Sequence, residues 1–208
     1  TEIVHEMAGG LTGGEEAARA IMTTDTVPKQ VALHHRNNWT VGAMAKGAGM
    51  LAPSLATMLV VITTDAVADS AALDTALRRA AGVTFDRLDV DGSCSTNDTV
   101  LMLANGKLGN TAIGLTGTNY RKFEHAVTET AAIVAEMIVK DGEGATKTVR
   151  IIVKGARSES DAENVARTIG NSLLVKSALY GEDPNWGRIV AAAGRAGVDF
   201  NPDRLDLY

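Results

Sequence analysis

The chain has 208 residues, a formal net charge of -5 and a pI of about 5.4. This acidic balance gives no electrostatic reason to expect nucleic acid or an anionic membrane as a partner. Hydrophobic residues make up 45% of the sequence, which indicates a packed globular core, and the single cysteine, Cys94, excludes an internal disulfide framework and fits a reducing compartment.

The first part of the chain predicts a short helix, a hairpin and a strand. Two glutamates at the start of GGEEAARAIMTTD favour the positive end of a helix over residues 15–22. The alternation in KQVALHHRNNWTVGAMAKG, with a turn at 36–38, predicts a hairpin from Lys29 to Lys46. The apolar, β-branched run TMLVVITTD then predicts a strand buried on both faces.

Helical periodicity dominates the middle of the chain. Apolar spacing predicts one helix over 70–88, with Asp69 or Ser70 as its cap, and a long amphipathic helix from residue 119 to about Gly142. The polar loop DVDGSCSTNDT lies between them and leads into another strand. Within it we expect Asn97 and Asp98 to brace a neighbouring site.

The character of the sequence changes near Gly144, where we predict a domain boundary between residues 1–143 and 144–208. TKTVRIIVKGA alternates as a strand, SDAENVARTIGNSLL resembles a capped helix, and GEDPNWGRIVAAAGRAG resembles a turn followed by a helix. DRLDLY resembles the start of another strand that is cut short. Together the patterns predict an α/β fold with sheets covered by helices.

The stretch AKGAGMLAPSLATMLVVITTDA places Thr57 behind the small Ala56, where a loop rich in glycine and proline becomes an apolar run. A buried strand threonine is one interpretation. The other is a nucleophile, because a small preceding residue lets the hydroxyl attack its own preceding carbonyl. That N-to-O acyl shift, followed by hydrolysis, would free Thr57 as an amino terminus. Its α-amine, which titrates at about pH 8, could then serve as general base.

This stretch, together with AIMTTDTVPK, DGSCSTNDT, DGEGATK and LVKSALYGEDPNWGRI, resembles the ornithine acetyltransferase family of arginine biosynthesis. The landmarks follow the family's order from Ile21 to Ile189. Two differences stand out. Ser54 and Leu55 replace the family's common Asn and Met, and the Thr-Gly segment of its oxyanion hole and its carboxy-terminal pocket residues are not in this sequence. We therefore expect an internal segment of a longer protein, inactive without those parts.

The resemblance assigns roles to five residues. It makes Ala56-Thr57 the scissile bond and Thr57 the nucleophile, and it implies that Thr23, Lys46 and Glu143 contact substrate beside Thr57. A lysine and a hydroxyl suit a substrate carboxylate, and a glutamate suits a substrate amino group. From residue type alone, a solvated strand-end lysine, a helix-capping threonine and a solvated loop glutamate are the alternatives.

The resemblance also implies an architecture and a reaction. The fold would be a four-layer α/β/β/α sandwich, with residues 1–143 as its catalytic segment and residues 144–208 as a smaller, truncated α/β domain. The activity would be glutamate N-acetyltransferase, moving acetyl from N2-acetylornithine to glutamate, with acetyl-CoA as a further candidate donor. No cofactor is implied, the cleaved chains would form a heterotetramer of two copies, and the expected location is cytoplasmic. An amino-terminal-nucleophile aminopeptidase or amidase, or a non-catalytic binding module, remains the alternative.

Other candidate sites are weaker. His34-His35 adjoin on a predicted strand and therefore point to opposite faces, which makes a poor metal pair, so we predict no metal. Gly47-x-Gly49 lacks the third glycine of a dinucleotide fingerprint. The uncharged window 47–64 reaches membrane-spanning length only by including Pro53 and several glycines, so we predict no transmembrane span.

Overall fold

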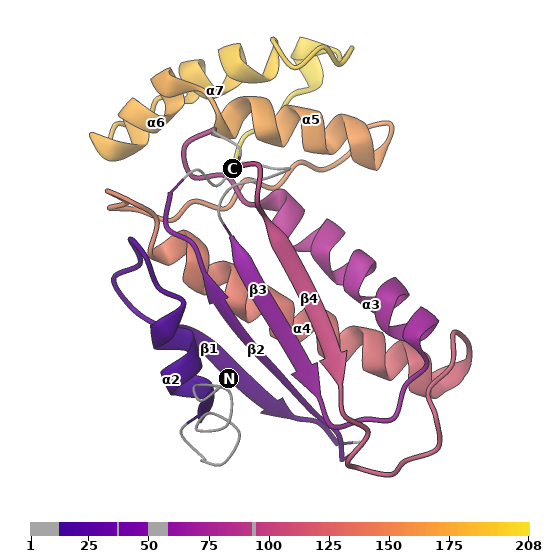
Figure 1. The fold of residues 1–208 in the computed structure, drawn as a ribbon. Helices are drawn as coiled ribbons and strands as arrows, with labels where there is room; N and C mark the ends of the chain where they lie inside the picture. Colours follow the sequence, from indigo (N-terminus) through magenta and orange to yellow (C-terminus); the bar gives the residue numbers. More distant parts are fainter. Residues whose placement is uncertain (1–12, 37, 50–57, 93–94) are drawn as a thin grey trace. The chain divides into compact units, whose positions relative to one another are not determined.

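The structure, a computed structural model, describes residues 13–36, 38–49, 58–92 and 95–208 (Figure 1). Its first elements in chain order are α2 (Gly13–Ala20), β1 (Lys29–His34), β2 (Thr40–Lys46), β3 (Leu59–Thr64), α3 (Ser70–Val83) and the 3-10 turn η1 (Phe85–Arg87). They are followed by β4 (Thr99–Ala104), α4 (Gly117–Lys140), α5 (Glu159–Gly170), α6 (Leu173–Tyr180), α7 (Trp186–Ala193) and η2 (Pro202–Arg204).

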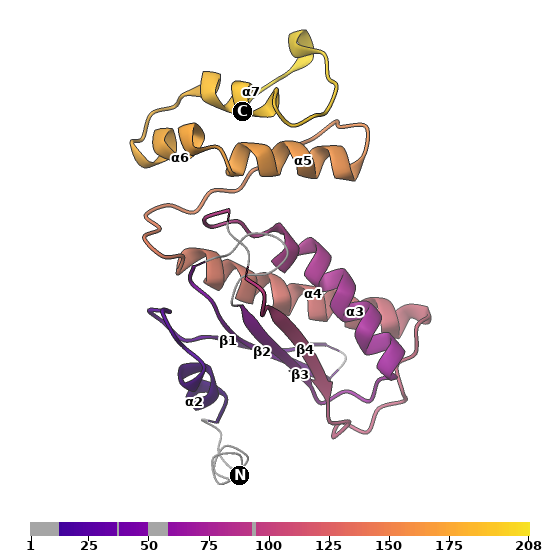
Figure 2. The ribbon, with the colours of Figure 1, turned by 45° about the horizontal axis from the view of Figure 1, so that its top comes forward.

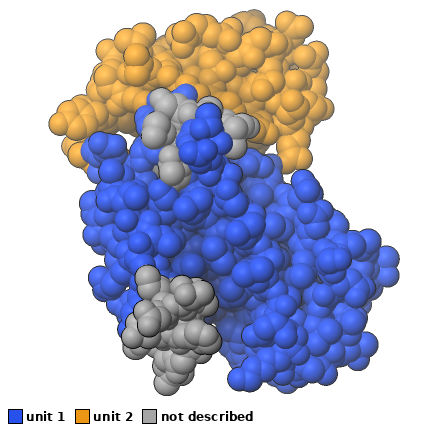
Figure 3. Space-filling model, in the orientation of Figure 1, with its two compact units in different colours: residues 1–145 blue, residues 146–208 orange. Residues whose placement is uncertain are grey.

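The chain divides into two compact units, residues 1–145 and 146–208, drawn in blue and orange in Figure 3. The division falls beside the change of sequence character at Gly144. The functional roles assigned to the two domains from sequence stay a prediction.

Unit 1 contains one four-stranded sheet in the order β1-β2-β3-β4. β1, β2 and β3 are antiparallel neighbours, which confirms the predicted hairpin. Its turn includes Asn38 in the left-handed region at φ 69°, with the Asn38 N–H donating to the His35 carbonyl at 2.8 Å. β3 and β4 are parallel, which requires a crossover connection, and α3 supplies it.

Helices α3 and α4 cover one face of this sheet, as Figures 1 and 2 show. Alanines 72, 76 and 80 repeat every four residues along α3 and are fully buried, so the two helices approach closely. On α4 the buried Phe123 meets Trp39 edge to face, with ring centroids 6.0 Å apart. These contacts build the main hydrophobic core.

The prediction that β3 is buried on both faces is wrong within the described residues. Val60 and Ile62 are buried beneath the helices, whereas Thr63 is exposed and Val61 is only half-buried. Helices α3 and α4 cover the face of the sheet on which Val60 and Ile62 lie. The described helix α2 makes its contacts with β1 and β2. The predicted α/β class is confirmed. The described residues form one sheet with a helical layer on one face, and the implied four-layer sandwich stays a prediction.

Unit 2 is helical in its described residues. Ile169, Val175, Ala192 and Ala193 form a small separate core between α5, α6 and α7. The single helix predicted over 160–174 is two helices, because the Ser172 hydroxyl accepts the Val175 N–H at 3.4 Å and starts α6 anew.

The strands predicted in TKTVRIIVKGA and DRLDLY are wrong for this structure. A strand needs a hydrogen-bonded neighbouring strand for its backbone groups, and neither segment forms strand pairs with any described residue. The turn and helix predicted in GEDPNWGRIVAAAGRAG are confirmed, because the GEDPNWGR segment leads into α7. Asn185 caps that helix by accepting the Arg188 N–H at 3.2 Å, and Arg188 Nη1 donates to the Leu174 carbonyl on α6 at 2.9 Å. None of the described helices is long and apolar enough to span a membrane.

Candidate functional site

Four strand ends meet at one end of the sheet in unit 1. Lys46, the last residue of β2, pairs with Leu59, the first residue of β3. Leu59 in turn pairs with Thr99, the first residue of β4, and Ala45 pairs with Lys29 at the start of β1. The antiparallel hairpins and the parallel crossover therefore gather residues from distant parts of the sequence at this sheet end.

The predicted nucleophile Thr57 and its partner Ala56 lie outside the described residues. The described chain resumes at Met58, whose N–H donates to Asp98 Oδ1 at 2.6 Å and whose carbonyl accepts the Thr99 N–H at 3.0 Å. Asp98 thereby fixes the start of β3, which agrees with the bracing role expected for it.

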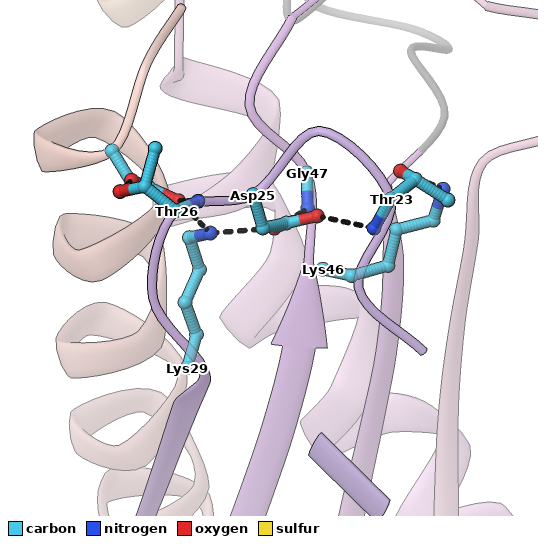
Figure 4. A network of polar contacts seen from close by, with 7 residues as sticks. Thr23, Asp25, Thr26, Lys29, Lys46 and Gly47 are labelled. Carbon is cyan, nitrogen blue, oxygen red and sulfur yellow. Dashed lines mark hydrogen bonds and ion pairs between the residues drawn. The ribbon is translucent and has the colours of Figure 1, made fainter. Parts of the chain in front are cut away.

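Lys46 and Thr23 lie in direct contact at this sheet end. The Lys46 ammonium donates to the Thr23 hydroxyl at 3.3 Å, and Lys46 is only 5% exposed (Figure 4). This burial contradicts the alternative of a solvated strand-end lysine. Thr23 lies after the end of α2 and before β1, so it does not cap the start of a helix, and the residue is exposed. The pair offers a cation and a hydroxyl to one anion.

Glu143 approaches the same sheet end from the segment after α4. Its N–H donates to the Ala48 carbonyl at 2.6 Å, which ties it to the loop that follows Lys46. Its carboxylate lies against Gly49, where an added Cβ would be 2.7 Å from Glu143 Oε2. An alanine at this position would therefore have to displace the Glu143 carboxylate, which is the far end of a flexible side chain. The structure thus brings Thr23, Lys46 and Glu143 to one end of the sheet, although their roles stay a prediction.

A buried charged network lies next to these residues. The Lys29 ammonium donates to Asp25 Oδ1 and to Asp141 Oδ2, each at 2.5 Å, and the side chains of Lys29 and Asp25 are 0% exposed and that of Asp141 is 6% exposed. Asp25 also accepts the Gly47 N–H at 2.7 Å and the Thr23 N–H at 3.1 Å (Figure 4). This Asp25–Lys29–Asp141 network joins β1, the end of β2 and the end of α4.

The pKa values of both carboxyl groups in the network are lowered from their usual value. Burial raises the pKa of Asp25, but hydrogen bonds from the Gly47 N–H, the Lys29 ammonium and the Thr23 N–H outweigh it and lower the pKa below 3.8. Burial likewise raises the pKa of Asp141, while Lys29 and both donors of Thr26 lower it below 3.8. Each carboxylate is therefore charged at neutral pH and accepts hydrogen bonds on both of its oxygens.

Sequence reasoning did not identify this network. Its signal lies within two of the segments that carry the family resemblance, because Asp25 and Lys29 belong to AIMTTDTVPK and Asp141 opens DGEGATK. Residue type alone indicates solvated loop charges at these positions. The pairing joins residues separated by 112 positions, so only the folded chain reveals that Lys29 is buried between two carboxylates.

The fold is that of an α/β protein, and a lysine, a threonine and a glutamate lie at one end of its sheet as a candidate site. Its family is shown by comparison with known proteins. The chain belongs to the ArgJ family, which it matches over residues 1–208.

Curated relatives of this family are close in sequence. A protein from Mycolicibacterium paratuberculosis named arginine biosynthesis bifunctional protein ArgJ is 60% identical over 205 residues, covering 99% of this chain and 49% of that protein. A protein from Methanocaldococcus jannaschii named glutamate N-acetyltransferase is 50% identical over 200 residues, covering 92% of this chain and 48% of that protein. The chain therefore spans about half the length of the curated relatives it matches.

A solved structure shares the fold. The crystal structure of arginine biosynthesis bifunctional protein ArgJ from Bacillus halodurans superposes with a TM-score of 0.64 and 40% sequence identity, covering 69% of this chain and 66% of that chain.

Proposed function

We propose that the complete protein carrying this chain transfers an acetyl group from N2-acetylornithine to glutamate in arginine biosynthesis. The observation that carries the proposal is the hydrogen bond from the ammonium of the buried Lys46 to the hydroxyl of the exposed residue Thr23, at the sheet end where the chain resumes after Thr57. The names of the curated relatives support the same reaction.

In the proposed first half-reaction, the Thr57 hydroxyl attacks the acetyl carbonyl of N2-acetylornithine. The α-amine of Thr57 takes up the hydroxyl proton and delivers it to the departing nitrogen, so that the C–N bond breaks and ornithine leaves. The product is an acetyl ester on Thr57. In the second half-reaction the glutamate amine attacks that ester, so that a C–N bond forms and the ester C–O bond breaks. The proton that the glutamate amine loses passes through the α-amine of Thr57 to the departing oxygen, which restores the threonine hydroxyl. Two such steps on one nucleophile predict ping-pong kinetics.

In this proposal three described residues bind the substrate. Donor and acceptor both carry an α-carboxylate, which the Lys46 ammonium and the Thr23 hydroxyl can bind together. Because Lys46 is buried, it reaches the ligand without first losing much side-chain freedom or hydration. Glu143, an exposed residue whose carboxylate lies beside Gly49, pairs in this proposal with a substrate ammonium group.

Self-cleavage at Ala56-Thr57 is part of the proposal, because it supplies the free α-amine. The two products would remain packed, giving a heterotetramer from two cleaved copies. The word bifunctional in the relatives' names supports a second acetyl donor, and acetyl-CoA is the one we propose.

The first test is intact-mass spectrometry of the complete protein, of a Thr57→Ala variant and of a Thr63→Ala control. Thr63 is an exposed threonine farther along β3. We expect wild type and the control to appear as two pieces, one beginning at Thr57, and Thr57→Ala to stay whole. An uncut wild-type protein would contradict self-activation and favour a non-catalytic module.

The second test is acetyl transfer with and without glutamate. We expect ornithine release from N2-acetylornithine to depend on glutamate, and N-acetylglutamate to form in equal amount. Ornithine release at the same rate without glutamate would identify an amidase, in which water is the acceptor. Replacement of N2-acetylornithine by acetyl-CoA in the same assay tests the second donor.

A further inference from the structure

The Asp25–Lys29–Asp141 network takes no part in the proposed chemistry, yet it lies beside every described residue that does. Burying three charges is expensive unless each is paired and hydrogen-bonded, and a well-packed apolar cluster would stabilise a fold equally well. All three side chains are nevertheless almost completely buried. Stability alone therefore does not explain why these three buried positions are charged.

The contacts of Asp25 indicate what that role is. Its Oδ2 accepts the backbone N–H of Thr23, and its Oδ1 accepts the backbone N–H of Gly47, the residue after Lys46. The backbone segments that carry the hydroxyl and the ammonium of the candidate site are therefore held by one carboxylate (Figure 4). Neither contact involves the functional side chains themselves.

Lys29 extends this arrangement to the third site residue. Its ammonium bridges Asp25 to Asp141, and Asp141 also accepts the N–H of Thr26 at 3.0 Å and its hydroxyl. Asp141 lies in the same short segment as Glu143, which is itself tied to the loop after Lys46. One connected set of charge-assisted hydrogen bonds thus spans the backbones that carry Thr23, Lys46 and Glu143.

We propose that Asp25 is a positioning residue for substrate binding, setting the separation of the Thr23 hydroxyl and the Lys46 ammonium, while Lys29 and Asp141 hold the Asp25 carboxylate in place. This inference rests on the proposed function. Displacement of either segment would misplace a substrate-binding group, and misplacement by about 1 Å can cost up to about a hundredfold in rate.

Two conservative variants separate positioning from stability. In Asp25→Asn one carboxylate oxygen becomes an NH₂ group, and whichever way the amide turns, it faces an N–H donor of Thr23 or of Gly47. In Asp141→Asn the remaining oxygen can still accept from Lys29 and the Thr26 N–H, while the NH₂ group donates to the Thr26 hydroxyl. Both variants remove one negative charge beside Lys29, but only the first must lose a backbone contact at the site.

The experiment measures kcat and KM for N2-acetylornithine and glutamate, together with thermal unfolding, on the complete wild-type protein and both variants. We expect both variants to lower Tm, Asp25→Asn by more because it also loses a backbone hydrogen bond. We expect a loss of at least about tenfold in kcat/KM for Asp25→Asn, carried mainly by KM, and a much smaller loss for Asp141→Asn. Equal losses of kcat/KM in the two variants, or a loss in kcat alone for Asp25→Asn, would overturn the positioning role while leaving the proposed function intact.

The experiment also covers an inactive wild-type protein and an Asp25→Asn variant that does not fold. An inactive but folded wild-type protein would overturn the proposed function, and this inference with it. If Asp25→Asn is recovered only unfolded, Asp25→Glu takes its place, because it keeps the charge beside Lys29 but moves the carboxylate by one methylene. We expect the same rise in KM for Asp25→Glu, and wild-type KM values would overturn the inference.

Discussion

Replacing Lys29 by methionine tests the energetics of the buried network most directly. The substitution keeps most of the side-chain volume and removes the charge, leaving Asp25 and Asp141 without the cation that each contacts at 2.5 Å. Because the Asp25 side chain is 0% exposed and that of Asp141 6%, water cannot replace the lost partner. Removing one member of a buried ion pair costs about 3–5 kcal/mol, and we expect Lys29→Met to lower the free energy of unfolding by that amount.

A control for this variant lies on the same unit. Lys140 forms an ion pair with Glu136 at 2.7 Å, but the two side chains are 62% and 54% exposed. Exposed pairs of this kind contribute about 0.2–1 kcal/mol, since water solvates either charge once its partner is removed. Lys140→Met should therefore lose several kcal/mol less than Lys29→Met, although both variants remove one positive charge.

The loss should also depend on pH. In the wild-type protein the pKa values of Asp25 and Asp141 are lowered below 3.8, so their contribution to stability is present above the unfolded pKa and is lost as the pH falls through the folded pKa. Without the Lys29 ammonium both folded pKa values rise. The variant's carboxyl groups then take up protons before those of the wild type, so the stability difference should shrink as the pH falls from 7 toward 4.

Urea unfolding of the complete protein at pH 7 and pH 4, followed by circular dichroism, measures both effects. A loss at pH 7 no larger for Lys29→Met than for Lys140→Met would refute the reasoning, because it would mean that Lys29 is solvated. A difference between wild type and Lys29→Met that grows toward pH 4 would contradict the assigned charges.

Two further predictions concern the edges of the site. Gly49→Ala places a Cβ 2.7 Å from Glu143 Oε2 and displaces this flexible carboxylate, so we expect little loss of stability but a rise in KM of about tenfold. Gly82→Ala is the control, because the nearest atom to its added Cβ is 3.9 Å away, and it should leave KM unchanged. Asp98→Ala removes the acceptor of the Met58 N–H and should destabilise by about 1–3 kcal/mol in urea unfolding, while Asp98→Asn keeps an oxygen acceptor and should lose less. An Asp98→Asn variant as unstable as Asp98→Ala would count against this hydrogen bond as the cause.

The local elements of unit 1 were largely predictable from the sequence. The alternation in residues 29–46 and the turn within it predict β1 and β2, because a hairpin depends on contacts between residues close in the chain. The apolar periodicity of 119–142 predicts α4, whose buried face follows that period. The predictions that were wrong depend on distant partners. Within the described residues β3 is covered on one face only, and the two segments of unit 2 that were predicted as strands lack a neighbouring strand.

For the candidate site, too, the sequence predicted one part and the structure revealed the other. Its residue types were available from sequence, since Thr23, Lys46 and Glu143 lie in segments whose pattern resembles the ArgJ family. Their spatial relation was not. Periodicity reports which face of an element is apolar, but the burial of Lys29 between Asp25 and Asp141 arises when the end of α4 meets the start of β1. Sequence alone determined which chemical groups the chain has to offer, and only the tertiary structure decided which charges lose water and therefore hold the others in place.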